Sequence, residues 1–186
     1  MELFKVIRNR RSIRKYKTDP ISDRDLKKIL EAARLAPSWA NTQCWRFIII
    51  VDPQVKNELA DTLPLRNRGA DAIRTAPVTI AACAEVNKAG FFDGVASTDK
   101  GDWFMFDVGI AMEHIALAAQ SLGLGTLHIG NFDALKAETV LNVPDGYRIV
   151  EIMPVGYPDE SPAARPRKAM NEIVFYDKFG RTVNPQ

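Results

Sequence analysis

Two hydrophobic spacings recur along this chain, and each predicts one kind of element. Apolar residues at every third or fourth position between Ser22 and Pro37 predict an amphipathic helix, with Ser22 as its N-cap and Pro37 at its end. Residues 45–51 instead form a short β-branched and aromatic run that stops at Asp52-Pro53. This run predicts a strand buried on both faces.

The same patterns predict the rest of the chain. We expect helices over 2–9, 54–62, 67–74, 103–122 and 133–141, and strands over 77–84, 126–129 and 147–155. The helix over 103–122 is apolar on nearly all sides, which indicates burial in a core or under a partner chain. Residues 87–101 are rich in glycine and small polar residues and predict a mobile excursion, and the proline-containing tail 162–186 should extend over a surface or a partner. Interleaved strands and helices predict an α/β or α+β fold with a central sheet flanked by helices.

Composition narrows the class of protein. With 186 residues, 46% hydrophobic and 26% charged, the chain fits one folded domain with a real core and not a disordered protein. The net charge of +2 argues against a polybasic nucleic-acid protein, but it hides an uneven distribution. Residues 1–34 hold eleven basic and five acidic residues, a net +6, and the remaining 152 residues carry −4. The basic head therefore needs its own explanation.

Several kinds of site and location are not expected. Two cysteines do not make a disulfide framework, and the two histidines, His114 and His128, lack metal-ligand spacing. The chain shows no signal peptide and no run of the ~20 apolar residues that a membrane span needs. We therefore expect a soluble cytoplasmic protein with no metal, membrane or nucleic-acid partner.

The densest candidate for chemistry is the segment 8–16, which contains Arg8, Arg10, Arg11, Ser12 and Arg14. Guanidinium groups and a hydroxyl suit a phosphate, because they form charge-assisted hydrogen bonds to its oxygens. A solvated basic face explains the same residues equally well at this point. A second basic cluster, at Arg165 and Arg167, would hold a dianion together with the first if the fold joined them.

Two further segments have the composition of ligand-contacting loops. Between Pro37 and Trp45, Asn41 and Gln43 offer amide groups and Trp39 offers a stacking face, although a helix-to-strand turn with a buried tryptophan is the more frequent explanation. Cys44 has no base near it in the sequence, so we expect a small buried residue and not a nucleophile. Glycines around residues 123–130 would let a ligand approach the backbone, with His128 as a contact candidate only.

Four motifs in this order resemble the nitroreductase family of flavoproteins. They are Arg10-Arg11-Ser12-x-Arg14, Ala36-Pro37-Ser38-x-x-Asn41-x-Gln43-x-Trp45-x-Phe47, Leu122-Gly123-Leu124-Gly125-Thr126, and Pro154-Val155-Gly156-Tyr157-Pro158 before Arg165-x-Arg167. The resemblance implies an α+β fold with a central mixed sheet, one domain over 1–186, a lid or insertion at 87–103 and a C-terminal arm at 162–186. It also implies an intertwined homodimer with FMN at the interface.

The resemblance further assigns roles to residues. Arg10, Arg11, Ser12, Arg14, Arg165 and Arg167 match flavin-binding positions, with Arg10 and Arg167 on the phosphate and Arg14 giving electrostatic support to the reduced ring. Pro37, Ser38, Trp39 and Asn41 match the loop that reaches the partner subunit's flavin. His128, Ile129, Gly130 and Asn131 match the strand-end segment under the ring. No side chain is expected to transfer a proton, since the cofactor carries the chemistry.

The chain departs from the family pattern at identifiable places. Trp39 stands where many relatives have a small residue, Cys44 stands where they have proline, and the segment 128–131 lacks a glutamate that some members place there. Residues 87–103 are where we expect most divergence, and any of four aromatic residues between 91 and 104 could cover the site: Phe91, Phe92, Trp103 and Phe104.

The activity implied is reduction of FMN by NADH or NADPH, followed by hydride delivery to a small acceptor such as a nitroaromatic or a quinone, in a ping-pong cycle. Three alternatives stay open from the sequence. The chain could be a flavin-binding storage or sensor protein without turnover, or a flavin dehydrogenase or dehalogenase on the same fold. It could also be a nucleic-acid module that uses Arg8–Lys17, which the acidic remainder and the lack of interleaved aromatic residues disfavour.

Overall fold

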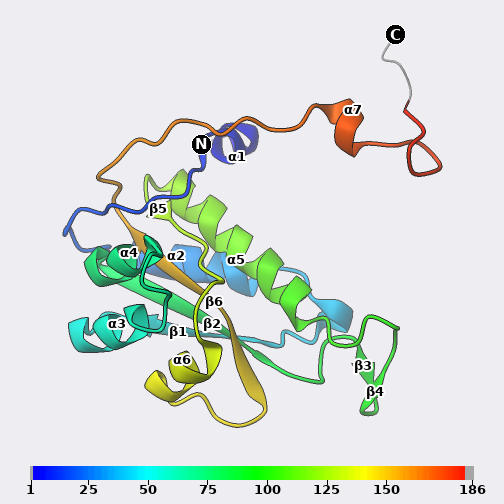
Figure 1. The fold of residues 1–186 in the computed structure, drawn as a ribbon, viewed down its shortest axis with the longest axis horizontal. Coiled ribbons are helices and arrows are strands. Elements are labelled where there is room, and N and C mark those ends of the chain that lie inside the picture. The colour runs from blue at the N-terminus through cyan, green and yellow to red at the C-terminus, as the bar shows by residue number, and fades with distance from the viewer. Residues whose placement is uncertain (1, 183–186) are drawn as a thin grey trace.

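The computed structural model describes residues 2–182, which form a four-stranded sheet with helices packed on both faces (Figure 1). Across the sheet the strands run in the order β1 (Trp45–Ile50), β2 (Val78–Glu85), β6 (Tyr147–Gly156) and β5 (Gly125–Thr126). Neighbouring strands are antiparallel. The parallel element of the predicted mixed sheet is the bridge between Ser12 and Thr126. The α+β class is confirmed.

The helices begin and end close to the predicted positions, except the last, which the sequence pattern does not predict. They are α1 (Leu3–Asn9), α2 (Asp23–Arg34), α3 (Pro53–Ala60), α4 (Gly69–Thr75), α5 (Phe104–Ser121), α6 (Ala134–Val140) and the short α7 (Met170–Ile173). The predicted N-cap of α2 is confirmed, since the Asp25 amide donates to Ser22 Oγ at 3.1 Å. Among residues 2–182 no helix combines the length and the apolar character needed to cross a membrane.

Strand β2 separates two hydrophobic cores because its successive side chains point to opposite faces of the sheet. Ile80, Ala82 and Ala84 pack in the core that includes α2 and α5. Ala81 and Cys83 pack in the second core, with α3, α4 and α6. Both faces of β2 are therefore covered, which explains why its sequence reads as a continuous apolar run.

The prediction that residues 45–51 are buried on both faces is wrong. β1 lies at the edge of the sheet, Arg46 is exposed, and Phe47, Ile48 and Ile49 are partly exposed. The helices that cover β2 cover this edge strand only in part. An apolar run by itself does not distinguish a central strand from an edge strand, and the strand buried along its length is β2.

Two segments have more structure than the sequence predicts. The excursion over 87–101 contains a small hairpin of β3 (Phe91–Phe92) and β4 (Val95–Ala96) at the side of the molecule (Figure 1). The tail runs from β6 past α1 and then projects away from the sheet, with the turn of helix α7 near its end (Figure 1). Residues 183–186 of the predicted arm lie outside the described residues.

Residues 10–17, which we call the strap, lie along the edge of the sheet at β5. The Ile13 amide donates to the Thr126 carbonyl at 2.9 Å, and the Lys17 amide donates to the Tyr157 carbonyl at 2.9 Å. The buried Tyr16 hydroxyl lies 2.7 Å from the Ile13 carbonyl and 3.2 Å from the Pro154 carbonyl. These bonds fix the backbone from which the arginine side chains of the strap extend.

The strap approaches the sheet at a pair of glycines. Gly125 and Gly156 face each other across the β5–β6 ladder. A Cβ atom on Gly125 would lie 2.6 Å from Ile13 Cγ1, and one on Gly156 would lie 3.0 Å from Tyr16 Cδ1. Both distances are shorter than ordinary van der Waals contact: a side chain at Gly125 would displace Ile13, and one at Gly156 would crowd Tyr16 and also meet Pro77 at 2.6 Å.

We predict that Gly125→Ala lowers the free energy of unfolding by about 1–3 kcal/mol, because the added methyl group must displace Ile13. Gly130→Ala is the matched control: an added Cβ there meets nothing within 4 Å, so we expect a change within about 0.5 kcal/mol. Urea denaturation of the cofactor-free protein measures both. Equal stability of the two variants would contradict the close approach of the strap.

Candidate functional site

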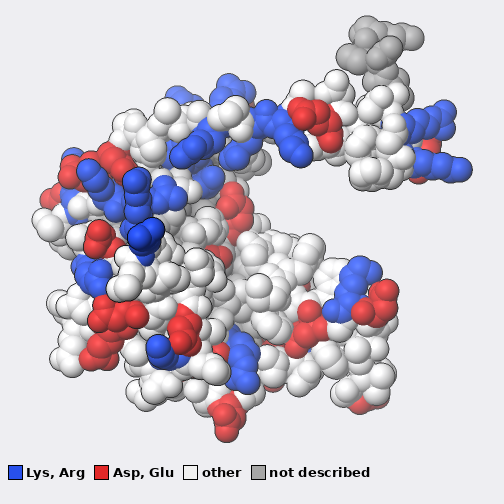
Figure 2. All heavy atoms as spheres, viewed as in Figure 1, with Lys and Arg blue, Asp and Glu red and all other residues white. Residues whose placement is uncertain are grey.

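The strap and the tail segment 162–167 enclose a cavity of about 570 Å³ at the end of α1. Six of its lining residues are arginines from the two ends of the chain: Arg8, Arg10, Arg11, Arg14, Arg165 and Arg167. Ser12 also lines the cavity, and no carboxylate does among the described residues. Figure 2 shows Lys and Arg side chains gathered over this part of the molecule. The fold thus joins the two basic clusters that lie far apart in the sequence.

The arginines of this cavity do not all have the same freedom. Arg11 Nη1 donates to the carbonyls of Arg8 at 2.6 Å and Arg10 at 2.9 Å, so this side chain caps the last turn of α1. Arg10 Nη1 is buried and has no hydrogen-bond partner among the described residues. Arg165 and Arg167 form no ion pair within residues 2–182. The strap and the tail therefore supply donors that the described chain itself does not satisfy.

A phosphate group fits this donor set. An unsatisfied buried donor costs about 1–3 kcal/mol, more when it is charged, and an anion at the cavity would supply the missing acceptor. Planar guanidinium groups match phosphate oxygens in geometry as well as in charge. With no lining carboxylate to compete, the cavity is suited to a phosphate monoester dianion.

A smaller cavity of about 120 Å³ lies beside the first, and Arg14 lines both. Its other lining residues are Asn67, Leu127, His128, Ile129, Gly130 and Asn131. The predicted segment 128–131 therefore lies next to the arginines of the strap. Asn67 is a site residue that the sequence analysis missed; its Nδ2 donates to the Asn131 carbonyl at 3.2 Å and its Oδ1 accepts from the Gly69 amide at 2.9 Å. The Asn-x-Gly turn before α4 was the available signal.

His128 lies between two carboxylates that the sequence analysis did not connect to it. Its Nδ1 is 2.6 Å from Glu151 Oε1 and its Nε2 is 3.3 Å from Glu113 Oε2. Burial alone would lower the pKa of His128, but the hydrogen bonds and charges of Glu113 and Glu151 outweigh it and raise the pKa to about 9. The imidazole is therefore protonated at neutral pH. Glu113 was visible in the sequence as one of the few polar residues of an otherwise apolar helix.

The loop that contains Pro37, Ser38, Trp39 and Asn41 lines neither of these two cavities. It lies at the other end of α5, where the Trp39 amide donates to both carboxylate oxygens of Asp107 at 3.1 Å. Asp107 is only 1% exposed, and its burial raises the pKa of that carboxyl. Trp103, one of the four predicted covering residues, lies against Trp39 with ring centroids 5.1 Å apart.

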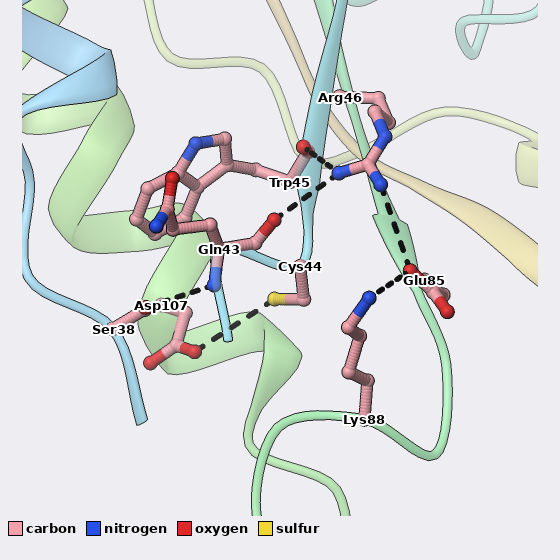
Figure 3. A network of polar contacts seen from close by, with 8 residues as sticks. All are labelled: Ser38, Gln43, Cys44, Trp45, Arg46, Glu85, Lys88 and Asp107. Carbon is pink, nitrogen blue, oxygen red and sulfur yellow. Dashed lines mark hydrogen bonds and ion pairs between the residues drawn. The ribbon is translucent and has the colours of Figure 1, made fainter. Parts of the chain in front are cut away.

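This loop has an unusual backbone. Ala40, Asn41 and Gln43 have positive φ angles of 41°, 57° and 49°. The left-handed region costs an L-residue about 1–2 kcal/mol, so three such residues need external support. Asp107 provides it at Trp39, and Ser38 Oγ accepts from the Gln43 amide at 3.0 Å (Figure 3). These hydrogen bonds stabilise the left-handed backbone of the loop.

Cys44 follows this loop and behaves as a small buried residue. Its Sγ donates to Asp107 Oδ2 at 3.7 Å (Figure 3), and burial with the neighbouring Asp107 charge raises the pKa of the thiol to about 12. A thiol with this pKa does not supply a thiolate at neutral pH.

The described residues also contain no group of three or more His, Cys, Asp or Glu side chains placed to hold a metal ion.

Comparison with known proteins identifies relatives that share the fold of this chain. A crystal structure of a nitroreductase family protein from Clostridium novyi NT superposes with a TM-score of 0.78 at 33% identity, covering 98% of this chain and 97% of the other. A relative from Archaeoglobus fulgidus, named for NADH dehydrogenase and NAD(P)H nitroreductase activity, is 32% identical over 86% of this chain and 87% of its own length. The FMN reductase [NAD(P)H] of Bacillus subtilis is 30% identical over 96% of this chain and 74% of its own.

The family assignment does not depend on any single relative. The model of the nitroreductase family matches residues 7–157, which include the strap, the loop after α2, the glycine pair and all four strands of the sheet. The resemblance seen in the four sequence motifs is confirmed over most of the chain, and the chain belongs to the nitroreductase family.

Proposed function

We propose that this protein is an FMN-dependent oxidoreductase that takes a hydride from NADH or NADPH and passes it to a small acceptor such as a nitroaromatic or a quinone. The observation that carries the proposal is the cavity lined by six arginines and Ser12, because its donors fit the phosphate of FMN. The nitroreductase family and the printed names of the relatives support the cofactor and the electron donor.

Each part of the two cavities has a role in this proposal. Arg10, Ser12, Arg165 and Arg167 bind the phosphate, and Arg11 holds the end of α1 in place for them. Arg14 lines both cavities, so it connects the phosphate to the segment 128–131, which lies under the ring. When bound, FMN supplies the hydride-transfer chemistry. Arg14 gives electrostatic support to the reduced ring, and no side chain is assigned a proton transfer.

The proposal includes a homodimer, since the loop at Pro37, Ser38, Trp39 and Asn41 lies away from its own chain's arginine cavity. In a dimer this preshaped loop serves the partner's flavin. Exposed apolar side chains support such an interface: Met105 and Phe106 on α5 line a groove, and the tail carries Ile173 and Phe179. The proposal also includes one domain over 1–186, with a lid at 87–103 and a C-terminal arm at 162–186. It places the protein in the cytoplasm.

The first prediction concerns turnover. We expect the purified protein to bind FMN, become yellow, and lose the yellow colour anaerobically when NADH or NADPH is added, because the bound flavin is reduced. Absorbance in the visible range measures this directly. A protein that takes up no FMN contradicts the proposal, and so does a yellow protein that neither nucleotide reduces, which is the behaviour of a storage or sensor protein.

The second prediction concerns the phosphate. Arg167→Ala removes a charge-assisted hydrogen bond worth about 1.5–3 kcal/mol, so we expect FMN to bind about 10- to 150-fold more weakly, and Arg10→Ala to act in the same direction. Fluorescence titration gives the affinities. Lys168→Ala is the matched control, because Lys168 is the basic residue directly after Arg167 and does not line the cavity. Unchanged affinity in Arg167→Ala would refute this role.

The third prediction concerns the dimer. We expect light scattering to give twice the mass of one chain, and Phe106→Asp to lower it to that of one chain, because a charge on the exposed groove of α5 disfavours its burial. Leu135→Asp is the control: Leu135 is 71% exposed on α6, which belongs to the other core, and this variant should stay dimeric. An FMN-bound monomer of the unmodified chain would contradict the shared site.

A further inference from the structure

A chain of ionised side chains connects the arginine cavity to the smaller cavity beside it. Arg10 Nε lies 3.9 Å from Glu113 Oε1, the other oxygen of Glu113 lies 3.3 Å from His128 Nε2, and His128 Nδ1 lies 2.6 Å from Glu151. The four residues come from the end of α1, from α5, from the segment after β5 and from β6. Glu113 is thus shared by two cations, one facing each cavity.

The two cations do not hold Glu113 equally. The contact with His128 is shorter, whereas Arg10 lies at the outer limit of an ion pair and forms no hydrogen bond to Glu113. A second Arg10 donor, Nη1, is buried without a partner in residues 2–182. While the imidazolium satisfies Glu113, the Arg10 guanidinium stays available to an anion in the cavity.

We propose that His128 is a positioning residue for phosphate binding, and that it acts through Glu113: the imidazolium occupies this carboxylate and so leaves Arg10 free to bind the phosphate of the flavin. This inference rests on the proposed function and deepens it. It gives His128 a role at the arginine cavity, whose wall it does not form.

The chemistry of imidazole predicts what happens when His128 loses its proton. A neutral imidazole has one N–H donor. We expect this proton to stay on Nδ1, because the contact of Nδ1 with Glu151 is shorter than that of Nε2 with Glu113, and Glu151 is the less exposed carboxylate. Nε2 then presents a lone pair to Glu113, and two acceptors facing each other repel. Glu113 then pairs with the remaining cation, Arg10. This ion pair draws the Arg10 guanidinium away from the phosphate.

The direction of the pH dependence follows. His128 has its pKa raised to about 9, so the imidazolium form is present at neutral pH and is lost as the pH rises through that value. The charged groups that face or adjoin His128 are Glu113, Glu151 and, across the small cavity, Arg14. Of the two carboxylates, Glu113 is the one that also lies near Arg10, and Arg14 lines both cavities. The affinity for phosphate should therefore decrease above about pH 9. By linkage, bound phosphate should raise the pKa of His128.

The experiment compares FMN with riboflavin, which has the same ring and no phosphate. Fluorescence titrations at about pH 7.5 and about pH 10 give both affinities, and FMN carries its phosphate as a dianion throughout this range because the second phosphate pKa is about 6. Dividing the FMN affinity by the riboflavin affinity removes effects on the ring. We expect this ratio to fall about fivefold or more between the two pH values in the unmodified protein.

Three variants identify the pathway. His128→Leu, which offers no donor to Glu113, should show the weakened ratio already at the lower pH, with no further change. Glu113→Gln should keep the high ratio at both pH values, because no carboxylate is left to withdraw Arg10 and the amide keeps the size and shape of the original side chain. His114→Gln removes the other histidine, whose Nδ1 contacts the Ala32 carbonyl at 3.0 Å, and should behave like the unmodified protein.

A ratio that does not change with pH in the unmodified protein, or that changes equally in Glu113→Gln, overturns the inference while leaving FMN binding, and so the proposed function, intact. If FMN does not bind at either pH, the proposed function fails separately. The inference is then tested by NMR titration of His128, assigned with the His114→Gln variant. Inorganic phosphate should raise the pKa of His128, and an unchanged pKa would overturn the inference.

Discussion

The arrangement of the candidate site depends on the close approach of the strap to two facing glycines. Gly125 and Gly156 leave room for Ile13 and Tyr16 at the point where β5 pairs with β6. The strap is then fixed by backbone hydrogen bonds to Thr126 and Tyr157. The tail leaves the sheet immediately after Gly156. The contact between the strap and the glycine pair therefore positions both walls of the arginine cavity, the strap and the tail. A side chain at Gly125 would displace Ile13 of the strap, and one at Gly156 would meet Pro77 at 2.6 Å as well as Tyr16 at 3.0 Å.

Placing many arginines around one cavity creates repulsion that the fold has to limit. Arg11 uses its donors on the last carbonyls of α1, and Glu113 lies near Arg10 without lining the cavity. The remaining guanidinium groups face the cavity with no carboxylate among its lining residues. Much of the positive charge of the basic head is therefore concentrated where the two ends of the chain meet, which is the basis for the proposed phosphate site.

Helix α5 supports both parts of the candidate site. Near its start the buried Asp107 holds the left-handed loop at Trp39, and in its second half Glu113 links Arg10 to His128. Both acids interrupt a helix that is otherwise apolar on almost every side. Burial of Asp107 carries a desolvation cost, which its hydrogen bonds with the Trp39 amide and Cys44 offset in part. Through these contacts the two acids connect α5 to the loop at Trp39, to Arg10 at the start of the strap and to His128 after β5.

The sequence by itself determined the helices, most of the strands, the family and the arginines that line the cavity, since these follow from local periodicity and from motifs that a short window contains. It did not determine that β1 is a partly exposed edge strand, because an apolar run has the same appearance in the centre and at the edge of a sheet. Asn67 and the partners of His128 were also missed. Their meeting depends on contacts between residues far apart in the chain, such as Glu113 with His128 and Glu151. Only the order of the strands and the packing of α5 decide which of these groups come within hydrogen-bond distance.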